Sequence, residues 1–163
     1  MTYQAGAAAP RVRWRPNAGG EERGLADAID LAARYGVAAR DPLLRFSIDA
    51  RLPTGLEATY GPRIDSARRS AVLWREYLTV DGRVVVRLAA RLFGSDEALV
   101  AVIAHKTHEI LALEGVFRDG GGRVTVAALL RLIDPILGTL HSEAWDVADA
   151  LVLRLRADRG EPA

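Results

Sequence analysis

The chain has 163 residues and a net charge of +1; half of its residues are hydrophobic and about a quarter are charged. This composition is typical of one globular domain with its own core, and the near-balanced charge gives no general argument for binding to nucleic acid or to a membrane surface. The sequence contains no cysteine, which excludes disulfides, thiolate zinc sites and thiol nucleophiles. Any bound metal must therefore be held by histidine and carboxylate side chains.

The sequence carries no recognisable targeting segment. No stretch approaches the roughly 20 apolar residues of a membrane span, and the N-terminus lacks the charged region and long apolar run of a signal peptide. We therefore expect a cytoplasmic protein by default, or one exported as part of a larger system. The arginines are spread along the sequence, so the expected partner is a protein or peptide, without nucleic acid or membrane.

The first half of the chain predicts a helix followed by strands. Residues 1–20 are rich in Ala, Gly and Pro, so a flexible segment with a short strand at 11–15 is expected. The next elements are a helix over 21–35, a strand over 43–50, a long connection over 51–70 and two strands over 71–80 and 83–92. Asp81–Gly82 between the last two strands is a strong signal for a two-residue hairpin turn.

The second half predicts helices only. Ser95 is suited to cap a long helix, with Asp96 and Glu97 in its first turn, and Gly115 is expected to end it. The later segments are a flexible turn at 119–122, a helix over 124–137 that Pro135 disturbs, and a last helix over 141–157.

Strands followed by a run of helices are typical of an α+β fold. We expect an N-terminal helix, a small antiparallel sheet with a β-hairpin, and three packed C-terminal helices. These elements would form one domain over residues 21–158, between the flexible segment 1–20 and a tail at 159–163.

Candidate site residues are concentrated in one apolar helix, AVIAHKTHEILAL at 101–113. On a helical wheel, Glu109 lies roughly 40° from His105 on one side and His108 roughly 60° on the other. Side chains spaced i, i+3 and i, i+4 can share one ligand. Lys106, the only lysine among 22 basic residues, lies roughly 100° from His105 and is expected to point away.

The last predicted helix carries the third histidine, His141. If His141 faces the central helix, then His105, Glu109 and His141 form a set of three nitrogen and oxygen ligands, with His108 as a further candidate. Three such ligands and a water are usual at an open zinc site, so zinc is the expected cofactor. Asp146 or Asp149 could orient an imidazole from behind.

The segment resembles the active helix of the zincin metallopeptidases. His105 stands in the place of the first histidine of their H-E-x-x-H motif, and HSEAW at 141–145 is similar to the E-x-x-A-D motif of gluzincins, with His141 at the ligand position. The wider pattern, over about residues 83–153, also resembles zincin-like domains at the ends of bacterial polymorphic toxins. This resemblance implies a zinc-dependent hydrolase that acts on a protein or peptide.

The motif departs from the family pattern at two positions. Lys106 replaces the glutamate that activates water, and Glu109 replaces the second histidine. Glu109 or His108 would then have to carry the catalytic proton. Two hypotheses stay open: a metal-dependent hydrolase, and a catalytically inactive zincin-like module that binds a partner and whose His/Glu cluster is a structural hydrogen-bond network.

Overall fold

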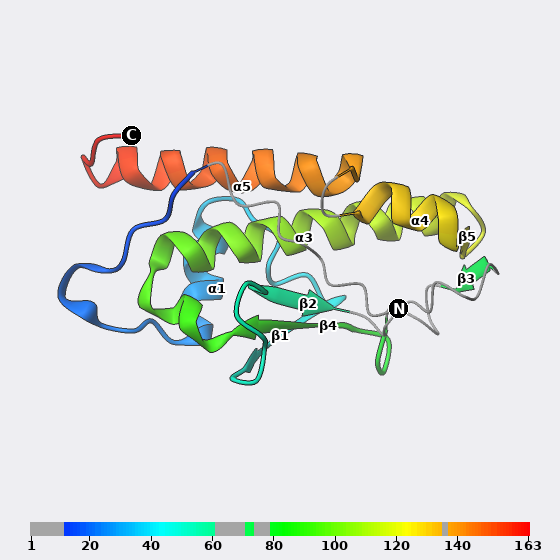
Figure 1. Cartoon of the computed structure of the whole chain (residues 1–163), viewed down its shortest axis with the longest axis horizontal. Coiled ribbons are helices and arrows are strands. Elements are labelled where there is room, and N and C mark those ends of the chain that lie inside the picture. Colours follow the sequence, from blue (N-terminus) through cyan, green and yellow to red (C-terminus); the bar gives the residue numbers. More distant parts are fainter. Residues whose placement is uncertain (1–11, 61–70, 74–78, 135–136) are drawn as a thin grey trace.

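The computed structural model describes residues 12–60, 71–73, 79–134 and 137–163. Figure 1 shows a long central helix, α3, between a small sheet on one side and the last helix, α5, on the other. The predicted α+β fold class is confirmed. The elements are η1 (Ala18–Gly20), α1 (Leu25–Arg34), β1 (Leu44–Asp49), β2 (Ala58–Tyr60), β3 (Ala71–Leu73), β4 (Val84–Ala89), η2 (Ala90–Gly94), α3 (Asp96–Asp119), β5 (Arg123–Thr125), α4 (Val126–Ile133) and α5 (Thr139–Asp158).

The main sheet has the strand order β1-β4-β2 and is mixed. Strand β1 pairs with β4 in parallel, from Leu44 opposite Val84 to Asp49 opposite Ala89, whereas β2 pairs with β4 in antiparallel. The prediction of a purely antiparallel sheet is therefore wrong. In the central strand β4, the buried residues Val84, Val86 and Leu88 alternate with half-buried Val85 and exposed Arg87, as expected of a strand with a helix across one face.

The predicted turn at Asp81–Gly82 is confirmed, but the long hairpin around it is not. Both turn residues have positive φ, as a type I′ turn requires, and Val80 forms an antiparallel bridge with Arg83. Upstream, however, β3 pairs with β5 in a separate two-stranded sheet, and residues 74–78 of the predicted hairpin lie outside the described residues. Strand β2 lies within the predicted connection 51–70, where its three residues are too few to show an alternating pattern.

Helix α3 begins as predicted and continues five residues further than expected. The Ser95 side chain accepts a hydrogen bond from the Ala98 amide, which caps the first turn. Gly115 does not end the helix, because Leu113 and Phe117 on either side of it are buried in a second hydrophobic cluster with α4 and α5 residues. The packing of these two side chains outweighs the cost of about 1 kcal/mol for an interior glycine.

The remaining helices bracket α3. Helix α4 begins after β5 and ends at Ile133, just before the residue that precedes Pro135, where a helical conformation is disfavoured. Helix α5 packs along α3 over much of its length (Figure 1).

The described residues 12–15 form no strand, in contrast to the prediction; the Arg15 amide instead donates a hydrogen bond to Glu97 of α3. Among the described helices, none is long and apolar enough to cross a membrane.

Candidate metal centre

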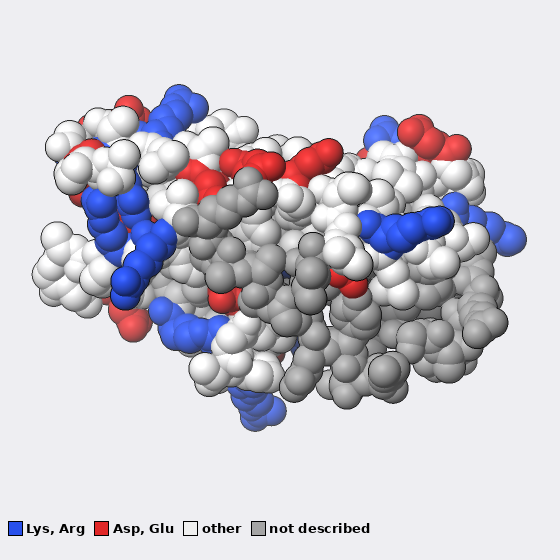
Figure 2. All heavy atoms as spheres, turned by 45° about the horizontal axis from the view of Figure 1, so that its top comes forward, with Lys and Arg blue, Asp and Glu red and all other residues white. Residues whose placement is uncertain are grey.

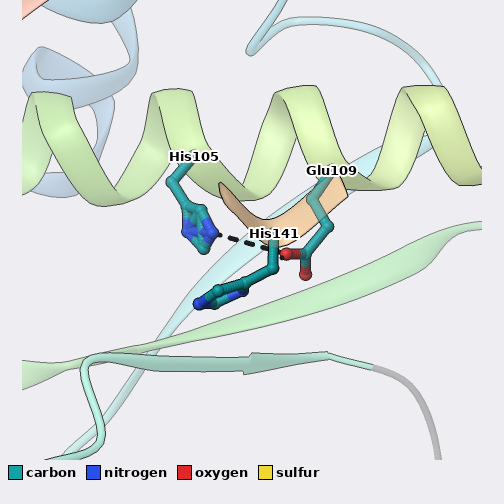
Figure 3. Close-up of side chains that lie close together, drawn as sticks. All are labelled: His105, Glu109 and His141. Atoms are coloured by element: carbon teal, nitrogen blue, oxygen red, sulfur yellow. Dashed lines mark hydrogen bonds and ion pairs between the residues drawn. The ribbon is translucent and has the colours of Figure 1, made fainter. Parts of the chain in front are cut away.

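The structure brings His105, Glu109 and His141 together at the contact between α3 and α5. His105 and Glu109 are one helical turn apart on α3, and His141 lies in the first turn of α5 (Figure 3). His105 and Glu109 are only 1% and 2% exposed, and His141 is half-buried. One ligand atom from each residue lies within 4.8 Å of the others, so the group could hold a metal ion.

The distances within the group suit a small tetrahedral ion. The oxygen Oε2 of Glu109 lies 3.3 Å from Nε2 of His105 and 3.0 Å from Nδ1 of His141. Two ligand atoms bound to zinc at its usual bond lengths and tetrahedral angle are about 3.3 Å apart. Two of the three pairs of ligand atoms are therefore already close to the spacing of a tetrahedral zinc site.

His105 is a buried imidazole whose ring nitrogens have no hydrogen-bond partner among the described residues. The 3.3 Å approach of its Nε2 to Glu109 does not have hydrogen-bond geometry. Burial, and then the charge of Lys106, hold the pKa of His105 well below its usual value, so the ring is neutral near pH 7. A buried polar atom left unpaired costs about 1–3 kcal/mol, and a neutral imidazole nitrogen is the form that binds a metal. Nε2 of His105 is therefore available as a neutral metal ligand.

Glu109 is a buried carboxylate with several charge-stabilising neighbours. The Tyr60 hydroxyl donates a 2.6 Å hydrogen bond to Oε1, and Nζ of Lys106 lies 3.5 Å from the same oxygen. Burial alone would raise the pKa of Glu109, but the charge of Lys106 and the hydrogen bonds from His141 and Tyr60 outweigh it and hold this pKa well below its usual value. Glu109 is therefore ionised, which leaves Oε2 as an anionic ligand.

Trp145 contacts both histidines. Its ring is stacked on His105, with centroids 4.2 Å apart and planes 18° from parallel, and its indole N–H donates a 3.1 Å hydrogen bond to Nε2 of His141. The indole nitrogen can only donate, so Nε2 of His141 is the acceptor and Nδ1 carries the proton that faces Glu109. Trp14 of the N-terminal segment lies against Trp145, with ring centroids 6.0 Å apart.

The other residues predicted for the site lie outside the metal group. His108 is half-buried and contributes no ligand atom to the group. Asp146 is exposed. Asp149 is buried and accepts a 3.4 Å hydrogen bond from the Val12 amide, with no described contact to either histidine. The polar group that orients His141 from behind is thus an indole rather than a carboxylate.

Three neighbours of the site make contacts that were not predicted from the sequence. Lys106 does not point away, because its long side chain bends back over one turn to Glu109 and is 14% exposed. Tyr60 ends a strand in a stretch without a clear pattern, so nothing in the sequence signals its role. Trp145 was interpretable, since it lies four residues after His141 on the same face of a helix.

We expect Trp145→Phe to lower the free energy of unfolding by about 1 kcal/mol or more, because it removes the hydrogen bond to His141 and part of the ring that packs on His105. Chemical denaturation of the purified variant measures the loss. Trp14→Phe is the matched control: the Trp14 indole nitrogen is buried without a hydrogen-bond partner among the described residues, so no hydrogen bond seen in the structure is lost. Equal losses in the two variants would contradict a contribution from the Trp145–His141 bond.

Comparison with known proteins adds no assignment: no protein family model, no curated protein and no solved structure matches the chain. The interpretation of the centre therefore rests on the geometry and chemistry of its own side chains.

Proposed function

We propose that this protein is a zinc-dependent hydrolase whose metal is held by His105, Glu109 and His141. The observation that carries the proposal is the convergence of the His105 and His141 imidazoles with the ionised Glu109 carboxylate, together with the lack of a hydrogen-bond partner for the His105 ring among the described residues. A set of three protein ligands is typical of catalytic zinc, since structural zinc sites usually have four. Zinc is the ion that best suits this mixture of nitrogen and oxygen ligands at tetrahedral spacing.

The side chains around the metal ligands would have distinct roles. Zinc bound here would supply a polarised water as the nucleophile. Tyr60 and Lys106 hold Oε1 of Glu109, which leaves Oε2 directed at the two histidines. Since Glu109 is engaged on both oxygens, it is poorly placed to act as a base as well. His108, on the same helix and outside the metal group, is the side chain we assign to proton transfer.

The substrate we propose is a protein or peptide. Support comes from the resemblance of the His105 helix and the HSEAW segment to zincin peptidases and to zincin-like domains of bacterial toxins. Lys106 in place of the usual glutamate separates this chain from the family pattern, so proton transfer would follow a different route here.

A second candidate function is favoured by the hydrogen bonds of His141. Trp145 donates to its Nε2 and its Nδ1–H faces Glu109, so His141 is fully paired without a metal. In this alternative the cluster is a structural network that fixes α5 on α3, and the domain acts by binding a protein partner. Zinc at Nδ1 would displace the proton there, so the two candidates exclude each other at this nitrogen.

Elemental analysis of the untagged protein separates the two functions. We expect about one zinc per chain, lost in His105→Ala and in His141→Ala because each removes one of three ligands. His108→Ala is the matched control on the same helix and should keep its zinc. The zinc-loaded His108→Ala variant should, however, cleave a random peptide library much more slowly than the zinc-loaded unmodified protein, because it lacks the group that we assign to proton transfer. Absence of zinc after loading and removal of excess would contradict the hydrolase and leave the structural network.

A further inference from the structure

A pocket of about 370 Å³ lies between the end of α1 and the C-terminal part of α5, away from the metal centre. Its lining is strongly basic, with four arginines and a single aspartate. The lining residues are Arg23, Leu31, Arg34, Tyr35, Arg154, Leu155, Asp158 and Arg159. In Figure 2, basic side chains are gathered at the left end of the molecule, the end at which Figure 1 places the end of α5.

The four guanidinium groups are assembled by the fold from opposite ends of the chain. Arg23 and Arg34 flank α1, whereas Arg154 and Arg159 lie at the end of α5. More than a hundred residues separate the two pairs in the sequence, so the arginines are dispersed along the chain and come together only in the fold. Packing of α1 and α5 around the same core places all four around one pocket.

Two of these arginines are held by a buried carboxylate. Arg23 and Arg159 donate hydrogen bonds of 2.6–2.8 Å to Asp96, whose side chain is 8% exposed. This contact fixes both guanidinium groups in place, and a planar guanidinium retains N–H groups for further acceptors. Asp96 neutralises only one of the two charges, so part of the positive charge remains at the pocket wall.

The other two arginines have no carboxylate partner within the described residues. Arg34 is exposed at the last position of α1. Arg154 lies over the ring of Tyr35, 5.4 Å from its centroid, which orients it without neutralising it. With Asp158, Asp96 and Asp27, whose charge also acts on Arg23, the four arginines leave an excess of about one positive charge at one concave site.

We propose that this pocket binds the phosphate group of a small phosphorylated molecule. A phosphate monoester carries nearly two negative charges at neutral pH, so the positive excess of the site attracts it. Guanidinium groups bind such oxyanions through paired hydrogen bonds, and two of those available are already fixed by Asp96. The volume of the pocket, about 370 Å³, is in the range of small-molecule sites, so we favour a small molecule over an extended polyanion.

The pocket is separate from the proposed zinc centre. Arg154 and His141 are thirteen residues apart on α5, which places them about 20 Å apart along the helix. The proposal therefore stands without the zinc proposal. We therefore expect that the loss of a zinc ligand leaves phosphate binding at this pocket unchanged.

Isothermal titration calorimetry of the full chain with inorganic phosphate, at constant ionic strength set by chloride, tests the proposal. We expect saturable binding of one phosphate per chain. Arg34→Gln and Arg154→Gln should each weaken it about tenfold, since each loses a charge-assisted hydrogen bond. Both side chains are exposed, so the variants should fold, and circular dichroism confirms it.

Two controls make the result specific. Arg131→Gln removes an exposed arginine from α4, outside the pocket, and should change the affinity less than twofold. His105→Ala should bind phosphate as the unmodified protein does. The proposal is overturned if phosphate shows no saturable binding, if Arg131→Gln weakens it as much as the pocket variants, or if His105→Ala abolishes it.

Discussion

Replacement of Arg156 by alanine is expected to lower the free energy of unfolding by about 3–5 kcal/mol, because it leaves a buried carboxylate without its counter-charge. Arg156 is 5% exposed and donates two 2.8 Å hydrogen bonds to Glu97 of α3. It also donates to the carbonyl oxygen of Arg13, at 2.6 Å. The ion pair thus joins α5, α3 and the N-terminal segment. Equilibrium denaturation in urea at pH 7 measures the loss.

Arg118→Ala is the matched control, since it removes an arginine–glutamate pair of similar length from the surface of α3. Arg118 and Glu114 are 2.7 Å apart with side chains 68% and 34% exposed, and such pairs contribute less than about 1 kcal/mol. A loss of similar size in both variants would contradict the importance of burial. A double replacement of Arg156 and Glu97 by apolar residues should recover much of the stability.

The effect of Arg156 should depend on pH with a definite sign. Burial alone would raise the pKa of Glu97, but hydrogen bonds from Arg156 and the Arg15 amide outweigh it and lower this pKa below its usual 4.5. A lowered carboxyl pKa in the folded state contributes stability above the unfolded pKa, and this stability is lost as the pH falls through the folded value. The difference between the unmodified protein and Arg156→Ala should therefore shrink below about pH 4.5.

The sequence was sufficient to predict elements that have a clear period or a specific local signal. Strand β1, the cap at Ser95, the turn at Asp81–Gly82 and the last helix belong to this group, as does the α+β class. Strand pairing was not predictable. Whether β3 joins β4 or β5 depends on contacts between segments far apart in the chain, and the parallel pairing of β1 with β4 carries no local signal.

The metal group shows the same division. The i, i+4 spacing of His105 and Glu109 specifies that both lie on one face of a helix, and the approach of His141 follows if the last two long helices pack on each other. The helical wheel gave the wrong direction for the Lys106 side chain. A wheel shows only the Cα–Cβ direction, whereas the long, flexible lysine side chain reaches Glu109 from a neighbouring face of the helix. Tyr60 comes from a strand that the sequence did not reveal.

Lys106→Met is expected to change the affinity for zinc and the stability of the metal-free protein in opposite directions. The ammonium group lies 3.5 Å from Oε1 of Glu109, so it repels a divalent ion bound at Oε2 of the same carboxylate. Removal of this charge should tighten zinc binding by at least about tenfold. Without zinc, the buried Glu109 loses a counter-charge, which should cost about 1–3 kcal/mol of unfolding free energy.

Competition with a chelating dye measures the zinc affinity, and denaturation in the presence of a chelator measures the stability. Arg118→Met is the control, because it removes a positive charge from the same helix at an exposed position. The opposite signs are what distinguish the two candidate functions. A structural network predicts the loss of stability alone, since Lys106 then only supports Glu109. A metal centre predicts that the variant gains affinity for zinc while its metal-free form becomes less stable. Both effects have one cause: the Lys106 ammonium group neutralises the same Glu109 carboxylate that zinc would bind.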